Sequence, residues 1–248
     1  MRKLGLIGYP LGHSFSKKYY QEKFESENIE GIDYDLYPIS KIEDFPNLYK
    51  NDKDFYGVNV TIPYKQSVIP YLDELSPEAK SIGAVNCIQI KQSENNQAKL
   101  IGYNTDVIGF MNSLKPLLNS KHTKALIFGN GGATKAVCYA LAELNIEFKV
   151  VSRTKSAKTM TYLELTEDII RDHKLLINCS PVGTAPNIDV CPDIPYQGIT
   201  DSHLLYDLIY NPEITLFLQK GREKGASIKN GYEMLVLQAE QNWIIWNQ

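Results

Sequence analysis

The sequence predicts an α/β protein of two domains, and three observations lead to this expectation. Short apolar runs alternate with helix-like segments along all 248 residues, which is typical of α/β units around parallel sheets. A glycine-rich turn, Gly129-Asn-Gly-Gly132, stands between an apolar run and a helical pattern. The polar stretch Pro116–Thr123 separates two series of such units, so we expect a domain boundary in or near Asp106–Thr123.

The first series contains apolar runs of strand length, separated by segments with helical spacing. The polar residues Ser93–Gln97 predict a hairpin turn between its last two strands. The expected strands are Lys3–Gly8, Asp33–Ile39, Phe55–Val60, Ala84–Ile90 and Lys99–Gly102. The expected helices are Ser16–Glu27, Ile42–Lys50, Lys65–Leu72 and Asp106–Leu118.

The second series repeats the alternation, and no internal sequence repeat accompanies it. Its expected strands are Thr123–Phe128, Phe148–Val151, Leu175–Asn178, Leu204–Ile209 and Ser227–Lys229, and its expected helices are Ala133–Leu144 and Tyr232–Trp246. We therefore expect residues 1–106 to form one domain, residues 107–231 a second, and residues 232–248 a C-terminal helix that packs back on the first domain.

Composition excludes several classes of function. A net charge of −3 without a basic stripe argues against nucleic-acid binding. No apolar run approaches the ~20 residues that span a bilayer, and Met1–Gly8 reads as a first strand rather than a signal peptide, so we expect a cytoplasmic protein without membrane association. The cysteines, at positions 87, 138, 179 and 191, form no CxxC pair, so no metal site is expected.

The turn at Gly129 has the context of a dinucleotide-binding site, because a strand precedes it and a helix follows. Gly129 allows a sharp exit from the strand, and Gly131 lets the backbone approach a pyrophosphate. The following helix presents free N–H groups and a positive dipole end to that group. The third glycine of the usual fingerprint is replaced by Thr134, a small residue. The alternative is a plain structural turn.

The next strand indicates which dinucleotide would bind. An NAD site carries Asp or Glu at the end of this strand, whereas here the strand ends in Val151-Ser-Arg-Thr154, and Glu147 lies at its opposite end. Arg153 can pair with a 2′-phosphate, which favours NADP(H), and the hydroxyls of Ser152 and Thr154 and the charges of Lys155 and Lys158 can add to it. The alternative is that Arg153 is an ordinary surface arginine.

Two charged residues that each follow a strand are candidates for chemistry. Lys65 ends Asn59-Val-Thr-Ile-Pro-Tyr-Lys65, and Asp106 ends Gly102-Tyr-Asn-Thr-Asp106. Residues at the carboxyl ends of strands line the ligand crevice of α/β sheets. A carbonyl that accepts hydride needs a proton, which a lysine oriented by a carboxylate can supply. Taken alone, Lys65 could be a surface charge and Asp106 a helix N-cap.

Four other polar residues have both a structural and a binding interpretation. Ser14 and Ser16 precede a predicted helix, so they could cap it or hold a substrate carboxylate. Asn86 interrupts an apolar run and needs a partner, from the backbone or from a ligand hydroxyl. Gln238 lies at the edge of an apolar helix face, where it could line a binding site or simply stand at the side of the helix.

Taken together, these segments resemble the shikimate dehydrogenase family over nearly the whole chain. Several motifs in the order of the family are far more specific than any one of them. The matching stretches are Gly8–Ser16, Asn59–Lys65, Gly83–Ile88, Gly102–Asp106, Gly129–Ala133, Ser152–Thr154, Asn178–Gly183, Tyr206–Pro212 and Asn230–Ala239.

The resemblance implies an NADPH-dependent oxidoreductase of chorismate and aromatic amino-acid biosynthesis, which reversibly reduces 3-dehydroshikimate to shikimate (EC 1.1.1.25). It implies that residues 1–106 bind substrate and that residues 107–231 form a Rossmann-type NADP-binding domain, with a cleft between the two. The partner is this small substrate, and the chain is expected to be a monomer or homodimer.

The resemblance also implies a role for each site residue. Lys65 and Asp106 become the catalytic pair. The substrate would contact Ser14 and Ser16 through its carboxylate, and Thr61, Lys65, Asn86, Asp106, Tyr210 and Gln238 through its ring oxygens. The cofactor would contact Gly129, Gly131, Gly132 and Ala133 through its pyrophosphate, Ser152, Arg153 and Thr154 through its 2′-phosphate, and Gly231 near its nicotinamide.

Three rival interpretations stay open at this point. One is a quinate/shikimate dehydrogenase that accepts quinate and NAD, against which Arg153 argues. Another is a non-catalytic NADP-binding regulator, which predicts a missing catalytic residue although Lys65 and Asp106 are both present. The third is a tetrahydrofolate dehydrogenase-like enzyme, which gives no reason for Ser14 and Ser16.

Overall fold

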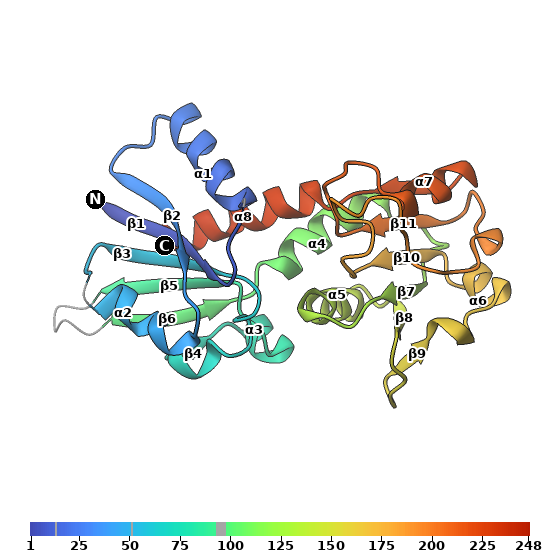
Figure 1. The fold of residues 1–248 in the computed structure, drawn as a ribbon, viewed down its shortest axis with the longest axis horizontal. Coiled ribbons are helices and arrows are strands. Elements are labelled where there is room, and N and C mark those ends of the chain that lie inside the picture. The colour runs from blue at the N-terminus through green and yellow to red at the C-terminus, as the bar shows by residue number, and fades with distance from the viewer. Residues whose placement is uncertain (13, 51, 93–97) are drawn as a thin grey trace. The chain divides into compact units, whose positions relative to one another are not determined.

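The chain divides into two structural units, each with its own sheet (Figure 1). The structure is a computed structural model that describes residues 1–12, 14–50, 52–92 and 98–248. The first unit comprises Met1–Asp106 and Gln238–Gln248, and the second comprises Val107–Leu237. The expected hairpin turn at residues 93–97 and the His13 of the first motif lie outside the described residues.

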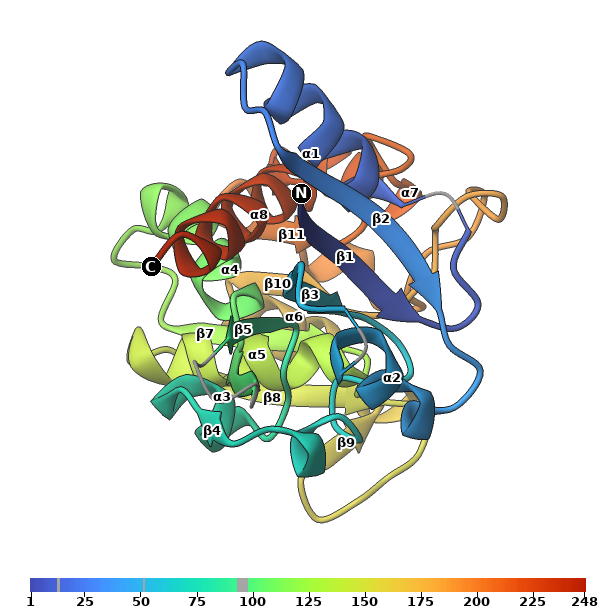
Figure 2. The same cartoon turned by 90° about the vertical axis from the view of Figure 1, so that its left-hand side faces the viewer.

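The sheet of the first unit is mixed, with the strand order β2-β1-β3-β5-β6-β4. Strand β1 runs parallel to β2 and β3, and the two views show β1 and β2 side by side (Figure 2). The predicted α/β architecture holds for this unit, and its sheet is mixed because β5 runs antiparallel to β3 and β6. Only residues 93–97 separate β5 from β6. A parallel pair of strands needs a crossover connection of about a dozen residues or more, so these two strands pair antiparallel. The strands are β1 Arg2–Gly8, β2 Ile32–Pro38, β3 Phe55–Val60, β4 Glu74–Leu75, β5 Cys87–Gln92 and β6 Ala98–Tyr103.

Both faces of this sheet are covered by helices. Helices α2, Phe45–Lys50, and α3, Pro77–Ile82, pack on one face through Phe45 and Ala79. Helix α1, Phe15–Ser26, and the C-terminal half of α8, Tyr232–Trp246, pack on the other face. Figures 1 and 2 show α1 on the side of the sheet opposite to α2 and α3.

Some of the expected elements of this unit differ from the observed ones. The expected helix Lys65–Leu72 is wrong, since only a 3₁₀ turn, Ile69–Tyr71, forms there. Pro70 lacks an N–H group and disfavours the α conformation of the residue before it. Likewise the segment Ile42–Asp44 is 3₁₀ rather than α-helical, and β5 begins at Cys87, three residues later than expected.

The second sheet is parallel throughout, in the order β12-β11-β10-β7-β8-β9. When the strands are numbered along the chain from β7 and the sheet is read from β9 to β12, the order is 3-2-1-4-5-6. This is the order of the dinucleotide-binding doubly wound fold. The predicted Rossmann-type α/β architecture is therefore confirmed. The strands are β7 Lys124–Phe128, β8 Glu147–Ser152, β9 Thr159–Thr161, β10 Leu175–Asn178, β11 Leu204–Asp207 and β12 Ser227–Lys229.

Helices cover both faces of this second sheet as well. Residues of α4, α5 and the start of α8 form one apolar cluster with it, and residues of α6 and α7 form another. Helix α4 ends at Leu114, earlier than the expected Leu118, and a 3₁₀ turn at Lys115–Leu117 follows because Pro116 cannot donate to the helix. The helices are α4 Asp106–Leu114, α5 Gly132–Glu143, α6 Glu167–Asp172 and α7 Leu216–Glu223.

Candidate functional site

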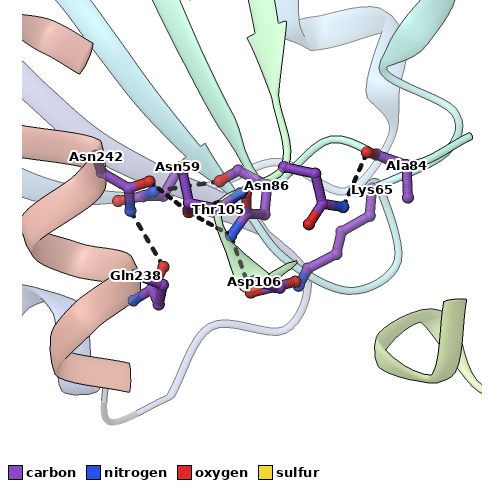
Figure 3. Close-up of polar contacts among 9 residues, drawn as sticks. Asn59, Lys65, Ala84, Asn86, Thr105, Asp106, Gln238 and Asn242 are labelled. Carbon is purple, nitrogen blue, oxygen red and sulfur yellow. Dashed lines mark hydrogen bonds and ion pairs between the residues drawn. The ribbon is translucent and has the colours of Figure 1, made fainter. Parts of the chain in front are cut away.

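Lys65 and Asp106 form an ion pair in the first unit. The ammonium Nζ of Lys65 lies 2.6 Å from Oδ2 of Asp106, and the side chains are only 20% and 13% exposed (Figure 3). The backbone N–H of Val85 donates to the carbonyl of Lys65 at 2.7 Å, which anchors the turn that carries the lysine. Lys65 is therefore held at both its backbone and its charged end.

Asn86 holds the other oxygen of the same carboxylate. Its Nδ2 donates to Oδ1 of Asp106 at 2.9 Å, and its backbone N–H donates to the carbonyl of Tyr103 at 3.0 Å. The antiparallel register that pairs Cys87 with Tyr103 brings Asn86 beside residues 104–106. Both oxygens of Asp106 are thus occupied by donors, which fixes the carboxylate against rotation.

A chain of buried side chains leads from Asn86 to helix α8 (Figure 3). Asn86 Nδ2 donates to the hydroxyl of Thr105 at 3.0 Å, and that hydroxyl donates to Oδ1 of Asn242 at 2.6 Å. Asn242 Nδ2 in turn donates to Oε1 of Gln238 at 3.1 Å. Three residues that the sequence assigns to substrate, Asn86, Asp106 and Gln238, therefore belong to one hydrogen-bonded network.

A second branch of the network leads toward α1. Asn59 donates to the carbonyl of Asn86 at 3.1 Å and accepts from the hydroxyl of Tyr34 at 2.9 Å. Burial raises the pKa of Tyr34, and a side-chain hydrogen bond with Ser16 partly offsets that rise. Ser16 is thereby connected to the residues around the lysine–aspartate pair.

Ser14 and Thr61 lie in the turns that flank this region. Ser14 is the N-cap of α1, and its Oγ accepts from the N–H of Lys17 at 3.4 Å, so the capping interpretation has a structural basis. The N–H of Thr61 donates to the carbonyl of Ile7 at 2.9 Å, and a Cβ on Gly8 would lie 2.5 Å from the Thr61 side chain. The first and second sequence motifs are therefore in direct contact.

Asn104 has a buried acceptor that nothing satisfies. Its Nδ2 donates to the carbonyl of Ala84 at 3.0 Å, while its Oδ1 has no hydrogen-bond partner in the described part of the chain. Leaving a buried acceptor unpaired costs ~1–3 kcal/mol, so this oxygen is a candidate to receive a donor from a ligand. Sequence reasoning gave Asn104 no role.

A cavity of about 890 Å³ lies at the carboxyl ends of β7, β8 and β10 in the second unit. These strands include β7 and β10, between which the strand order reverses, and ligands of open α/β sheets bind at such a point. The lining residues are Gly129–Gly131, Ser152–Ser156, Tyr162, Cys179–Val182 and Cys191–Asp193.

The glycine turn at this cavity fits a pyrophosphate. Gly129 has φ +110°, and a Cβ there would lie 3.0 Å from the backbone nitrogen of Ser180. A Cβ on Gly131 or Gly132 would meet no atom within 4 Å, so the space over the start of α5 is open. The hydroxyl of Thr134, which stands in place of the third glycine, donates to the carbonyl of Gly129 at 3.0 Å and accepts from the N–H of Gly131, so it holds the turn against the start of α5.

The end of β8 supplies the charge that a 2′-phosphate needs. Arg153 is exposed and lines the cavity, and no carboxylate of the described residues lies within ion-pair distance of it. Lys155 is instead paired with Glu164 at 2.6 Å, and the hydroxyl of Ser152 donates to the carbonyl of Thr154. The residues present therefore fit NADP(H), with Arg153 as the main cationic contact.

The remaining predicted residues lie elsewhere in the second unit. Ala133 belongs to the first turn of α5, beside the cavity lining. Gly231 precedes α8, and a Cβ on it would lie 2.1 Å from the carbonyl oxygen of Leu208. Tyr210 is 38% exposed. Neither Gly231 nor Tyr210 is among the residues that line the cavity.

The loop that follows β10 begins in the matching stretch Asn178–Gly183, but no site role was assigned to its residues from the sequence. Ser180 lines the cavity, and both its N–H and its hydroxyl donate to Oδ1 of Asn178, at 3.0 and 2.7 Å. Asn178 donates in turn to the buried carboxylate of Asp207 at 3.0 Å. The available signal was a polar Asn-Cys-Ser run at the carboxyl end of an apolar strand, the same signal that marked Lys65 and Asp106.

Within the described residues, no helix is long and apolar enough to cross a membrane, and no group of three or more His, Cys, Asp or Glu side chains gathers as metal ligands.

Comparison with known proteins gives consistent matches along the chain. Residues 6–88 match the family model described as the shikimate dehydrogenase substrate binding domain. The shikimate dehydrogenase (NADP(+)) of Halothermothrix orenii is 40% identical over 98% of this chain and 90% of that protein. The enzyme of the same name from Carboxydothermus hydrogenoformans is 38% identical over 94% of this chain and 87% of that protein.

Solved structures show the same likeness. The shikimate 5-dehydrogenase of Thermus thermophilus, in complex with NADP(H) and shikimate, is 31% identical and superposes with a TM-score of 0.84. The alignment covers 99% of this chain and 93% of that one.

Proposed function

The chain belongs to the shikimate dehydrogenase family, and we propose that it reversibly reduces 3-dehydroshikimate to shikimate with NADPH. The observation that carries this proposal is the Lys65–Asp106 pair, held at 2.6 Å among buried amides of the first unit. The relatives that share its length are named for the same reaction with NADP(+). A cytoplasmic location, a monomeric or homodimeric state and the domain boundaries at residues 106 and 231 stay predictions from the sequence.

In the proposed mechanism Lys65 is the general acid. Bound NADPH supplies the hydride that adds to the carbonyl carbon of the substrate. As negative charge develops on the carbonyl oxygen, Nζ of Lys65 gives it a proton. In the reverse direction the same nitrogen, as the neutral amine, removes the proton from the hydroxyl.

Asp106 acts on the lysine and on the substrate. Its Oδ2 accepts from Nζ and so directs the ammonium, while Asn86 prevents the carboxylate from turning away. A carboxylate in this position also accepts from a ring hydroxyl. Ser14, Ser16, Thr61, Tyr210 and Gln238 are proposed to bind the remaining oxygens of the substrate.

The cofactor-binding part of the proposal rests on the cavity of the second unit. Its open glycine turn and the start of α5 are suited to the pyrophosphate, and Arg153 is suited to the 2′-phosphate. The proposal assigns Gly129, Gly131, Gly132 and Ala133 to the first group, and Ser152, Arg153 and Thr154 to the second. Gly231 is assigned to the nicotinamide end.

The direct test is an NADPH oxidation assay with 3-dehydroshikimate, and its reverse with shikimate and NADP. Lys65→Ala should lower kcat by roughly 10²- to 10⁴-fold, because it removes the general acid. The Kd for NADPH should stay within about twofold of the wild-type value, because Lys65 belongs to the first unit and the cavity to the second.

Lys80→Ala is the matched control, because Lys80 is exposed on α3 of the same unit, and it should leave kcat unchanged. Undiminished turnover by Lys65→Ala would refute the mechanism. Faster wild-type turnover with quinate and NAD would replace the substrate and cofactor proposed here, and the absence of turnover with either acid would favour the non-catalytic regulator.

A further inference from the structure

Asn242 is a fully buried amide on α8 to which the proposed function assigns no role. It lies one helical turn beyond Gln238, and its two ends contact different partners. Its Oδ1 accepts from the hydroxyl of Thr105 at 2.6 Å, and its Nδ2 donates to Oε1 of Gln238 at 3.1 Å (Figure 3). Asn242 therefore connects a proposed substrate residue to the network that holds Asp106.

The direction of each hydrogen bond in this network follows from the carboxylate at its end. An ionised carboxylate only accepts, so the Asn86 atom that lies 2.9 Å from Asp106 must be the NH₂ group. The backbone N–H of Thr105 requires the same orientation, because it donates to the opposite end of the Asn86 amide at 2.7 Å. Two independent partners thus fix the Asn86 amide.

The Thr105 hydroxyl has a single hydrogen, and its position determines the orientation of the Asn242 amide. Asn86 Nδ2 donates to the hydroxyl oxygen, so the hydroxyl hydrogen must go to an acceptor. Oδ1 of Asn86 is 3.2 Å away and already receives the Thr105 N–H, whereas Oδ1 of Asn242 is 2.6 Å away. The hydrogen therefore goes to Asn242, whose amide must present its carbonyl to Thr105 and its NH₂ to Gln238.

We propose that Asn242 is a positioning residue for the amide of Gln238. Its Nδ2 holds the carbonyl of Gln238, and this directs the NH₂ group of Gln238 toward the substrate. Gln238 then donates to a substrate oxygen. A ring hydroxyl that gives its single hydrogen to the Asp106 carboxylate has only lone pairs left for Gln238, so the amide must present its NH₂ group to it. This inference rests on the proposed function, because it needs Gln238 to contact the substrate. It adds that the preference of Gln238 is set by Asp106, through Asn86, Thr105 and Asn242.

Asn242→Asp tests the proposal because it keeps the shape of the side chain and replaces its NH₂ group by an acceptor. The carbonyl of Gln238 would then face an acceptor, so the amide should turn and present its oxygen to the substrate. We expect the KM for shikimate to rise about tenfold or more, since the hydrogen bond from Gln238 is lost and its oxygen faces a hydroxyl whose hydrogen already goes to Asp106. The KM for NADP should change by less than about twofold.

The double variant separates positioning from a general structural effect. If Asn242 acts through Gln238, Asn242→Asp should add less than about twofold to the KM for shikimate when Gln238→Ala is already present. Asn247→Asp makes the same charge change at an exposed position of the C-terminal segment, and its kinetics should match the wild type. Thermal unfolding of each variant reports whether it is folded.

Asn242→Ala is a second variant for the case that the buried carboxylate introduced by Asn242→Asp prevents folding. It frees the Gln238 amide to turn, and the KM for shikimate should rise about threefold, again without addition to Gln238→Ala. Effects that add fully to Gln238→Ala, or that fall on kcat and the KM for NADP instead, would overturn the role of Asn242 while the proposed function stands. A wild-type protein without activity on shikimate would overturn the proposed function first, and this inference with it.

Discussion

Arg153 is the side chain that we propose to discriminate NADP(H) from NAD(H). It follows β8, where an NAD site would place a carboxylate, and it lines the cavity without a carboxylate partner among the described residues. Lys155, the neighbouring cation, would have to give up its bond to Glu164 before it could bind a phosphate. Of these two cations at the cavity, Arg153 is therefore the one that we propose for the 2′-phosphate.

Arg153→Ala should raise the KM for NADPH by roughly 10- to 100-fold, because it removes a charge-assisted pair of hydrogen bonds. The KM for NADH should change by less than about threefold, because NADH has no 2′-phosphate. Steady-state kinetics with both cofactors measures this. Arg171→Ala is the control, since Arg171 is half exposed on α6 and pairs with Glu167 and Asp168. Equal losses with both cofactors would show that Arg153 does not read the 2′-phosphate.

The residues that could be predicted from the sequence are those whose signal is local. Lys65 and Asp106 each follow a predicted strand, Asn86 interrupts an apolar run, and Arg153 stands at a fixed place after a glycine turn. Thr105 and Asn242 carry no such signal, because their role is the contact between them, which joins β6 to the last helix.

The loops that follow β10 and β11 are tied together by one buried carboxylate. Asp207 ends β11 and is completely buried, and it accepts from Asn178, from the hydroxyl of Thr215 and from the N–H of Ile209. Through Asn178 it supports Ser180 at the cavity. Burial raises the pKa of Asp207 to about 6, and this effect outweighs the three donors, which act in the opposite direction.

This carboxylate predicts a stability that falls with rising pH. The folded protein binds the Asp207 proton more tightly than the unfolded chain does between pH 3.8 and about 6, so this contribution to the free energy of unfolding decreases across that window. The decrease approaches ~3 kcal/mol by pH 7, at ~1.4 kcal/mol for each pKa unit. Asp207→Asn has no such titration. Urea unfolding at pH 4.5 to 7.5 should therefore show the wild type losing stability relative to the variant.

Asp168→Asn controls for the general loss of one negative charge, because the side chain of Asp168 is 90% exposed in the same unit. A difference between wild type and Asp207→Asn that stays constant over this pH range would mean that Asp207 titrates alike in the folded and unfolded states.

Strands and helices with a clear apolar pattern could be predicted from the sequence, and very short helices could not. Strand β10 and helix α8 have the predicted bounds, since each combines an apolar pattern with a polar boundary. Helices α3 and α6 are six residues long, too short for a helical period to repeat, and neither was predicted. The expected helix at Lys65–Leu72 does not form, because Pro70 interrupts the segment despite its apolar spacing.

The chain completes its first unit only with its last residues. Trp246 is fully buried there, its Nε1 donates to the carbonyl of Ile88 at 3.0 Å, and a Cβ on Gly57 would lie 2.3 Å from that nitrogen. The side-chain amide of Gln89 donates to the carbonyl of Ile245, and the hydroxyl of Tyr20 donates to the carbonyl of Ala239. Segments from both ends of the sequence therefore form one core, whereas the second unit is continuous in sequence.

Deletion of residues 238–248 should consequently unfold the first unit and spare the second. Truncation of a buried Trp alone costs ~3–5 kcal/mol, and this deletion also removes Ala239 and Ile245 from the same cluster. Hydrogen exchange measured by mass spectrometry should show loss of protection in β1, β3 and β5, with protection kept in β7 and β10. NADP should still bind, while shikimate should not. Removal of Asn247 and Gln248 alone is the control, because both are exposed. It should change neither the hydrogen-exchange protection nor the binding of NADP and shikimate. Protection retained in β1 and β3 after the longer deletion would show that residues 1–106 fold without the end of α8.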